Sequence, residues 1–207
     1  MTQRYDYGKG SLDFGDLESD PLEQLKLWLE DAVQAQVVEP TAMCLATVGP
    51  DGQPSARFVL LRDLSERGLT FFTNYESRKG QELETNPKAC VAFWWAALER
   101  QVRVEGVVER LPETDSDAYF ESRPRESQIA SAASPQSREV GSREELEARL
   151  EDLMRKHPDV VPRPAHWGGY VLVPHTFEFW QGRKARFHDR ILYRRHAAGW
   201  KLVRLAP

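Results

Sequence analysis

Four apolar residues in a row, Phe58-Val59-Leu60-Leu61, are bracketed in this chain by Arg57 and Arg62. The apolar run favours a buried strand. A guanidinium group is always charged, and its planar fork suits phosphate or carboxylate oxygens. Arginines at both ends of a buried strand therefore require an anionic partner. Taken alone, the motif favours a carboxylate of the chain itself over a bound anion.

A second cationic group follows one hairpin later. Arg67-Gly68 is a turn signal, and residues 69–73 favour the next strand. Ser77 can cap a short helix, whose free backbone N–H groups would join Arg78 and Lys79 in a seat for an anion. A solvated helix start is the alternative explanation of these residues.

Tyr119, Arg123 and Ser127 form a third set of donors, spaced four residues apart. They would share one side of a helical path if Pro124 only starts a new turn. Hydroxyl and guanidinium groups suit a phosphate monoester, and we expect Arg62 to join them. The spacing by itself favours an ordinary surface helix with incidental donors.

The last group lies in residues 179–190, where a predicted strand ends at a turn rich in cations. Arg186, His188 and Arg190 alternate, so in an extended chain their side chains would point to the same side. Like charges on one face repel, which predicts an anion or an electron-rich ring between them. His188 alone would be explained by a nearby acid, but the trio favours a functional role. The chain shows no metal-ligand spacing, no nucleophile elbow and no dinucleotide fingerprint.

Composition limits what these groups can bind. The formal net charge of −4 and the pI near 5.8 give no general attraction for nucleic acid or a membrane surface, so a small anion is the expected ligand. Cys44 and Cys90 lie in apolar runs and indicate core residues rather than a disulfide framework. The sequence has neither a run of about 20 apolar residues nor the apolar core of a signal peptide. We therefore expect a cytoplasmic protein.

The elements that position these groups are mostly strands. Residues 1–19 are polar and glycine-bearing and predict a mobile arm, followed by a single domain over residues 20–207. Short connections without crossover helices favour an antiparallel barrel, giving a mainly β fold with flanking helices (α+β). We expect helices over 21–33, 78–86, 113–120 and 142–156, and strands over 41–48, 55–62, 69–73, 88–95, 100–111, 169–173, 176–181, 190–194 and 200–205. Asp20 can cap the first helix, and Val33 is expected on its apolar side. Gly106 indicates a bulge in its strand, and residues 130–137 favour a loop.

With these residues laid out, the chain resembles the pyridoxine/pyridoxamine 5'-phosphate oxidase family of flavin enzymes. The resemblance runs from about Tyr7 to Pro207 and rests on separated motifs that fall in the family's order. These motifs are Arg57 to Arg62, Thr73-Asn74, Ser77-Arg78-Lys79, Glu99-Arg100-Gln101-Val102, Tyr119-Phe120, Ser122-Arg123-Pro124-Arg125, Ser127-Gln128-Ile129, Gln136-Ser137, Trp167-Gly168-Gly169, Phe179-Trp180-Gln181-Gly182 and His188-Asp189-Arg190.

The resemblance implies a split β-barrel homodimer with one FMN in each of two clefts at the subunit interface. It implies oxidation of pyridoxine 5'-phosphate or pyridoxamine 5'-phosphate to pyridoxal 5'-phosphate, with O2 reduced to H2O2. The residues expected to hold FMN are Arg57, Phe58, Val59, Leu60, Leu61, Arg62, Phe72, Thr73, Arg78, Lys79, Gln101, Gln136, Ser137, Trp180 and Arg190, some of them from the partner subunit. The residues expected to bind substrate are Tyr7, Arg62, Tyr119, Arg123, Ser127, Arg186, Phe187 and His188.

Arg186 and His188 are the expected catalytic residues, since the resemblance implies that they hold the pyridine ring while hydride leaves. Tyr7 belongs to an N-terminal segment that can close over the site. The sequence departs from the family pattern at Arg62, where a lysine is usual, at Phe72, where a tyrosine is common, and at Phe187, which replaces a smaller apolar residue. At position 62 a planar fork replaces a compact ammonium group while the positive charge remains.

Two other functions remain open at this point. One is a split-barrel flavoprotein reductase with a different electron donor, and the other is a non-enzymatic protein that stores or delivers a flavin or pyridoxal phosphate. The complete set of phosphate-binding candidates and the Arg186/His188 pair favour the oxidase.

Overall fold

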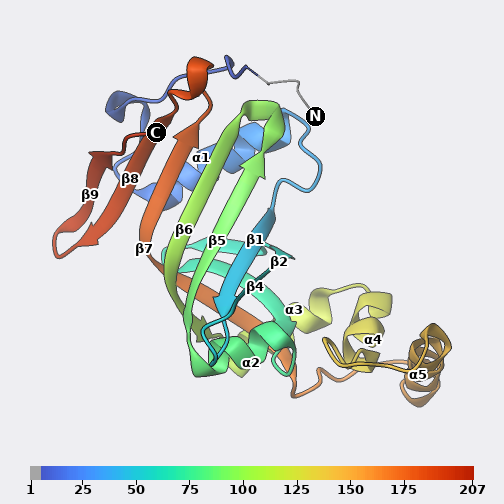
Figure 1. The fold of residues 1–207 in the computed structure, drawn as a ribbon. Coiled ribbons are helices and arrows are strands. Elements are labelled where there is room, and N and C mark those ends of the chain that lie inside the picture. The colour runs from blue at the N-terminus through green and yellow to red at the C-terminus, as the bar shows by residue number, and fades with distance from the viewer. Residues whose placement is uncertain (1–5) are drawn as a thin grey trace.

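A nine-stranded antiparallel sheet dominates residues 6–207, the part of the chain that the computed structural model describes (Figure 1). Its strands are β1 (Ala42–Val48), β2 (Pro54–Leu60), β3 (Asp63–Ser65), β4 (Gly68–Asn74), β5 (Lys88–Trp95), β6 (Arg100–Arg110), β7 (Trp167–Gln181), β8 (Asp189–His196) and β9 (Gly199–Arg204). The strand order is β2-β1-β5-β6-β7-β4-β3, with β8 pairing with both β7 and β9. The predicted antiparallel barrel is confirmed.

Strand β7 gives the sheet its curl. Its first half pairs with β4 and its second half with β8, while β6 pairs along almost its whole length, so the sheet closes into a half-barrel (Figure 1). The pairing of β6 with β7 shifts register between Glu105 and Gly106, as the sequence predicted. A Cβ atom at Gly106 would lie 2.2 Å from the carbonyl oxygen of Val173, so only glycine allows the strands to approach here.

Helix α1 (Pro21–Gln34) packs its apolar side against the strands. It begins as predicted, because the Asp20 side chain accepts the N–H of Leu22. Trp28, which was not among the predicted core residues, is the large core residue of this helix. Its ring packs edge-on against Phe179, at 5.1 Å between centroids. Val33 was expected on the same side but is 56% exposed. It lies near the end of the helix, outside the buried apolar stripe.

The remaining helices frame the other end of the sheet (Figure 1). They are α2 (Arg78–Thr85), α3 (Glu113–Ser122), α4 (Arg125–Ala133) and α5 (Arg143–Lys156), with short 3-10 turns at Phe14–Asp16, Ala96–Leu98 and Lys184–Arg186. Helix α4 starts directly after Pro124, but it reaches Ala133 where a loop from residue 130 was expected. No helix within residues 6–207 combines the length and apolar character that crossing a bilayer requires.

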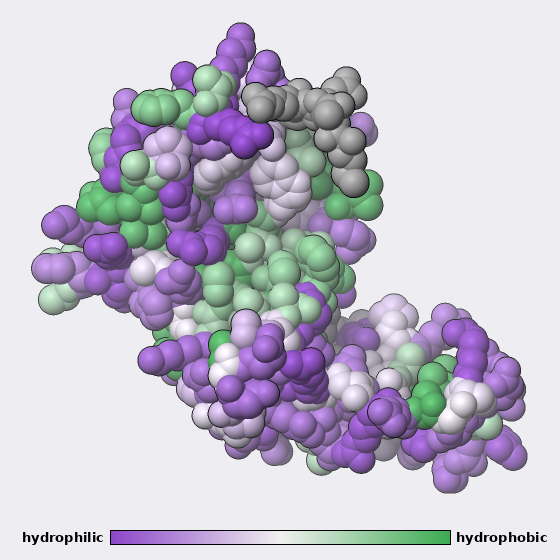
Figure 2. All heavy atoms as spheres, viewed as in Figure 1, coloured by the Kyte–Doolittle hydropathy of each residue, from purple (hydrophilic) through white to green (hydrophobic). Residues whose placement is uncertain are grey.

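Strand β2 does not have the buried environment that its apolar run predicted. It ends the strand order and pairs only with β1, so its outer side has no covering element among residues 6–207. Phe58 is 75% exposed there, and Leu61, just beyond the strand, is the buried member of the run. Figure 2 shows apolar residues gathered on the sheet face over β1 and β5. This surface suits contact with another protein.

The described part of the predicted N-terminal arm, residues 6–19, runs along the opposite end of the sheet. The backbone N–H groups of Gly8 and Lys9 donate to the Glu99 carboxylate at 2.7 and 2.9 Å, and Leu12 donates to Asp189 at 3.1 Å. Residues 1–5 lie outside the described residues, so the mobility of the arm stays a prediction.

Candidate functional site

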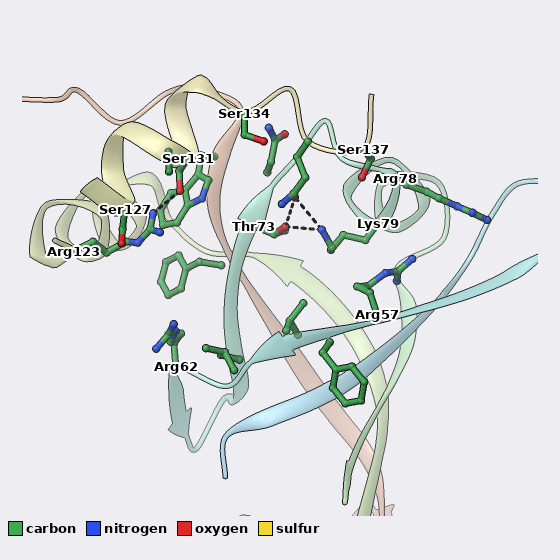
Figure 3. Close-up of a pocket in the computed structure, with 18 of the residues that line it drawn as sticks. Arg57, Arg62, Thr73, Arg78, Lys79, Arg123, Ser127, Ser131, Ser134 and Ser137 are labelled. Carbon is green, nitrogen blue, oxygen red and sulfur yellow. Dashed lines mark hydrogen bonds between the residues drawn. The ribbon is translucent and has the colours of Figure 1, made fainter. Parts of the chain in front are cut away.

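A cleft of about 890 Å³ lies between β2, β4, the start of α2 and the α3–α4 region. It brings together most of the predicted site residues: Arg57, Phe58, Val59, Leu60, Arg62, Phe72, Thr73, Arg78, Lys79, Tyr119, Arg123, Ser127, Gln136 and Ser137. Arg62 and Arg123 lie on one side of the cleft, and Arg57 and Lys79 lie on the other (Figure 3).

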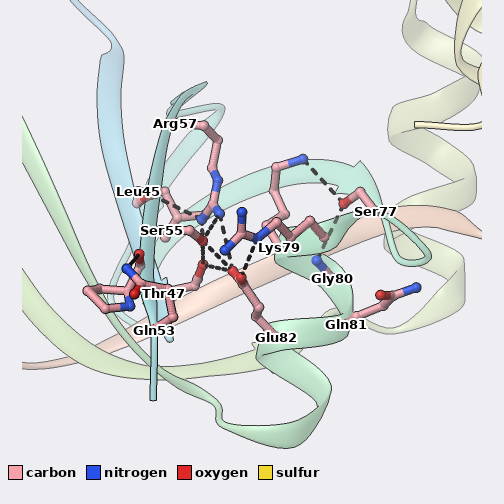
Figure 4. Close-up of polar contacts among 12 residues, drawn as sticks. Leu45, Thr47, Gln53, Ser55, Arg57, Ser77, Lys79, Gly80, Gln81 and Glu82 are labelled. Carbon is pink, nitrogen blue, oxygen red and sulfur yellow. Dashed lines mark hydrogen bonds and ion pairs between the residues drawn. The ribbon is translucent and has the colours of Figure 1, made fainter. Parts of the chain in front are cut away.

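Lys79 projects from the first turn of α2 into a set of uncharged oxygens. Its Nζ donates to Thr73 Oγ1 at 3.0 Å and to Gln136 Oε1 at 3.0 Å (Figure 3). It also donates to Ser77 Oγ at 3.3 Å (Figure 4). Ser77 also caps the helix, as predicted, by accepting the N–H of Gly80. Burial, reinforced by the nearby Arg57 charge, lowers the pKa of Lys79 to about 8. An anion at this amine would offset both effects.

Arg57 and Arg78 share one buried carboxylate, that of Glu82. Arg57 Nη2 lies 3.2 Å from Glu82 Oε2, and Arg78 Nε lies 2.8 Å from Oε1. The hydroxyls of Thr47 and Ser55 donate to the same carboxylate at 2.5 and 2.6 Å (Figure 4). Burial would raise the pKa of Glu82, but these hydrogen bonds outweigh it and lower the pKa to about 2.

The opposite side of the cleft carries two guanidinium groups without an acid. Neither Arg62 nor Arg123 forms an ion pair with a carboxylate of residues 6–207. Arg123 donates to Ser131 Oγ at 2.9 Å, and its Cζ lies 4.7 Å from the centre of the Trp167 ring. Burial lowers the pKa of Arg123 and the Arg62 charge lowers it further, against the opposing effect of Tyr119. Two unneutralised cations side by side are suited to a bound anion.

Aromatic stacking fixes the donors on this side. Phe72 and Tyr119 stack with 3.8 Å between ring centroids and 16° between their planes. The Trp167 ring is nearly parallel to Tyr119, at 6.3 Å and 3°. Tyr119 is the last-turn residue of α3 and Arg123 its C-cap, so the break at Pro124 leaves both, with Ser127 of α4, on the cleft. All three line the same cleft, but from two helices with a break between them and not along one helical path.

Eight predicted residues do not line the cleft. Leu61 is in the core, and Tyr7, Gln101, Trp180, Arg186, Phe187, His188 and Arg190 belong to segments at the other end of the sheet. Several of these form a second group of their own. The His188 ring lies 4.5 Å from Trp180 and 5.5 Å from Tyr7 between centroids, and Gln101 pairs with Trp180 across β6 and β7.

The alternation expected for Arg186, His188 and Arg190 is wrong because the chain is not extended there. Lys184–Arg186 form a 3-10 turn, and Ala185 and Arg186 both have left-handed φ angles of 56° and 61°. The backbone N–H of Arg183 donates to His188 Nδ1 at 3.1 Å and closes the loop. Burial and the Arg186 charge lower the pKa of His188, whereas Asp189 opposes them. Arg190 is held separately by Glu178, at 2.8 Å.

Sequence reasoning missed Glu82, Ser131 and the role of Trp167. Glu82 lies four residues after Arg78 in a predicted helix, which is a recognisable ion-pair spacing. Trp167 was noticed only as part of a motif with two glycines. Nothing in the local sequence signals its contact with Arg123, because 44 positions of chain separate the two residues.

The family assignment follows from comparison with known proteins. Residues 29–155 match the family model described as pyridoxamine 5'-phosphate oxidase, and residues 167–207 match that of the pyridoxine 5'-phosphate oxidase C-terminal dimerisation region. The chain belongs to the pyridoxamine 5'-phosphate oxidase family. It is therefore an oxidoreductase, and its dimerisation region indicates a homodimer.

Relatives resemble the chain over nearly its whole length. The pyridoxine/pyridoxamine 5'-phosphate oxidases of Ralstonia pickettii (strain 12J) and Thermosynechococcus vestitus (strain NIES-2133 / IAM M-273 / BP-1) are 55% and 54% identical to it, each covering 99% of this chain and 97% of the relative. Among solved structures, PhzG from Burkholderia lata 383 in complex with tetrahydrophenazine-1-carboxylic acid is 35% identical, with a TM-score of 0.90, and covers 97% of this chain and 100% of its own.

A pyridoxamine 5'-phosphate oxidase-related, FMN-binding protein from Nostoc punctiforme PCC 73102 shares the fold at 18% identity and a TM-score of 0.72, over 88% of this chain and 97% of its own. The split β-barrel expected from the sequence is thus the observed fold.

Proposed function

We propose that the protein is an FMN-dependent oxidase that converts pyridoxine 5'-phosphate or pyridoxamine 5'-phosphate to pyridoxal 5'-phosphate and reduces O2 to H2O2. The observation that carries this proposal is the presence of two separate cationic groups in one cleft. Each suits one phosphate group, which carries about −1.5 to −2 charge near neutral pH. A flavin mononucleotide and a phosphorylated vitamin would together use both.

The residues of the first group fit the phosphate end of FMN. Arg57, Arg78 and Lys79 provide cationic donors, and Thr73 and Gln136 provide a hydroxyl and an amide beside Lys79. The lowered pKa of Lys79 supports this fit, because a buried amine lined by uncharged oxygens is best stabilised by an anion. The chain segment from Phe58 to Leu60 and residues Arg62, Phe72 and Ser137 would contact the rest of the cofactor.

The second group fits the substrate phosphate. Arg62 and Arg123 would neutralise it, and the hydroxyls of Tyr119 and Ser127 would donate to its remaining oxygens. Bound FMN supplies the two-electron redox chemistry of the reaction. The chain's own part is to hold the substrate ring in a fixed orientation and to keep water from the reacting atoms.

A second copy of the chain would complete the cleft. In one protomer Gln101, Trp180, Arg186, Phe187, His188 and Arg190 lie away from the Arg57/Lys79 side, together with Tyr7. The homodimer and the exposed apolar surface around Phe58 support a cleft at the subunit interface, to which each protomer contributes one group. Arg186 and His188 would then orient the pyridine ring, and Tyr7 would lie over it.

The proposal is tested by oxygen uptake and peroxide formation with the FMN-loaded protein. Pyridoxine 5'-phosphate and pyridoxamine 5'-phosphate should each drive both, while unphosphorylated pyridoxine, which cannot engage Arg62 and Arg123, should do so only weakly. Arg186→Ala should slow turnover with the phosphorylated substrates. A flat oxygen trace with both phosphates would contradict the oxidase. Oxygen uptake with a reduced phenazine carboxylate, and with neither vitamin phosphate, would instead support a PhzG-like reaction.

A further inference from the structure

Glu82 is a buried acid that stands directly behind the cleft wall. The residue is 4% exposed and does not line the cleft, yet it contacts three residues that do, Ser55, Arg57 and Arg78. Thr47 and Ser55 occupy its remaining acceptor capacity, so the carboxylate is held from several directions at once. Any effect of Glu82 on a ligand must therefore pass through the residues that it holds or through its charge on Lys79.

The arginines depend on Glu82 to different extents. The side chain of Arg78 is 59% exposed, and its ion pair with Glu82 joins two residues one helical turn apart. Arg57 also donates to the Leu45 carbonyl at 3.2 Å and to the hydroxyls of Thr47 and Ser55. Those two hydroxyls donate in turn to Glu82, so the carboxylate organises the whole set of contacts around Arg57 (Figure 4).

Charge balance gives the carboxylate a second consequence. Arg57, Arg78 and Lys79 would repel one another in one small region of low dielectric. One carboxylate among three cations leaves two positive charges, which matches the charge of a phosphate monoester. The seat is therefore cationic enough to bind a phosphate dianion while its parts remain fixed in the absence of ligand.

We propose that Glu82 is the positioning residue of the cofactor phosphate seat: it fixes Arg57 and Arg78 and allows Lys79 to stay charged beside them. The inference rests on the proposed function, because it assigns this seat to the FMN phosphate. It concerns how the seat is built and not which reaction follows.

The titration of Lys79 supplies the decisive readout. The charged groups that face it are Arg57 from β2 and Glu82 from α2, and its other neighbours, Thr73, Ser77 and Gln136, are neutral. Its pKa, about 8, is lowered by burial and Arg57 and raised by Glu82. Removing the carboxylate would lower this pKa further, so Lys79 would lose its charge at a lower pH.

The test compares FMN with riboflavin, which has the same ring system and no phosphate. The full-length protein, freed of flavin, is titrated with each by fluorescence quenching from about pH 6.5 to about pH 9.5. In the wild type, FMN affinity should fall as the pH rises through about 8, while riboflavin affinity should stay level. In Glu82→Gln, FMN should bind at least roughly 10-fold more weakly near neutral pH, with the fall moved to lower pH and riboflavin unchanged.

Glu84→Gln is the matched control. Glu84 lies on the same helix, but its side chain is 65% exposed and pairs with Arg110 at 2.8 Å, outside the seat. This variant should bind both flavins like the wild type. Glu82→Asp keeps the charge with a shorter side chain. It should show the wild-type pH dependence of FMN binding and part of the wild-type FMN affinity. This variant provides a second measurement if Glu82→Gln does not fold.

Two results would overturn the role of Glu82. One is an FMN affinity and pH dependence in Glu82→Gln equal to those of Glu84→Gln. The other is an equal loss of FMN and riboflavin affinity, which would make Glu82 an ordinary structural residue. If Glu82→Asp is the only folded variant, a pH dependence shifted from that of the wild type contradicts the role. A wild type that binds FMN no more tightly than riboflavin would instead contradict the phosphate seat itself.

Discussion

Arg57 and Arg78 line one side of the cleft and share the buried carboxylate of Glu82, whereas Arg62 and Arg123 line the other side without a carboxylate partner in residues 6–207. Arg123 rests instead on the Trp167 ring, at 4.7 Å, and donates to Ser131. Two cationic sides of one cleft are thus stabilised in different ways, one by ion pairing and the other by stacking and neutral hydrogen bonds.

The difference fits two ligands with different residence times. A seat fixed by an internal acid is preorganised, so little ordering is required when the ligand arrives. A cofactor that stays bound benefits from this rigidity. On the other side, a bound anion would relieve the repulsion between Arg62 and Arg123. Under the proposed function, charge neutralisation would therefore contribute directly to capturing the substrate, which must exchange in every turnover. We call the Arg62/Arg123 side the acid-free side, because neither arginine pairs with a carboxylate of residues 6–207. Removing one cation should therefore weaken ligand binding most on this side.

Arg123→Ala is the change with the largest expected effect on substrate binding. It removes a partly buried cationic donor, and charge-assisted hydrogen bonds of this kind are worth about 1.5–3 kcal/mol. We expect KM for pyridoxine 5'-phosphate to rise by roughly 10- to 100-fold, with a smaller change in kcat, measured by oxygen uptake under saturating FMN.

Arg149→Ala is the control for the loss of a positive charge. Arg149 pairs with Glu145 on the exposed side of α5 at 2.9 Å. Its removal should leave KM for pyridoxine 5'-phosphate unchanged. Both Arg123→Ala and Arg149→Ala should bind FMN as tightly as the wild type. An Arg123→Ala variant with wild-type KM, or one that loses FMN as readily as substrate, would contradict the separation of the two sides.

Trp167→Phe tests the stacking support with a smaller expected effect. A cation over an aromatic ring contributes about 0.5–2 kcal/mol, and phenylalanine is the weaker partner. We expect KM for pyridoxine 5'-phosphate to rise by roughly 3- to 10-fold, without a change in the pH dependence of FMN binding. Trp28→Phe provides a matched control, because Arg100 lies 4.4 Å above that ring, outside the cleft. An equal effect of both changes on KM would indicate general destabilisation, and a thermal melt would show it.

Some of this arrangement follows from local sequence signals. The caps at Asp20 and Ser77, the irregularity at Gly106 and the break at Pro124 each depend on a few neighbouring residues, and the structure confirms them. The cleft candidates could be named for the same reason, since arginine, lysine and hydroxyl donors near strand and helix ends are recognisable by type. The family resemblance assigned the flavin and the substrate to them.

Other features depend on contacts between distant parts of the chain. The apolar residues around Phe58 predict a buried strand, but the position of β2 at the end of the strand order, which local sequence does not encode, leaves Phe58 exposed. The acid that Arg57 requires proved to be Glu82, 25 positions away on α2. The turn at Ala185 is closed by His188 Nδ1, so the alternation read from an extended chain did not hold.

Arg62→Lys should have the smallest effect on KM, and it tests most directly how the two sides of the cleft differ. Arg62 lines the acid-free side, and no carboxylate of residues 6–207 holds its fork, so we expect the charge to matter more there than the planar shape. We expect KM for pyridoxine 5'-phosphate to change by no more than about 3-fold, whereas Arg62→Gln should raise it by roughly 10-fold.

Arg57→Lys, the same exchange on the other side, should weaken FMN binding clearly, because one ammonium group cannot reach Leu45, Ser55 and Glu82 together. Equal tolerance of lysine at both positions would mean that Glu82 does not distinguish the two sides.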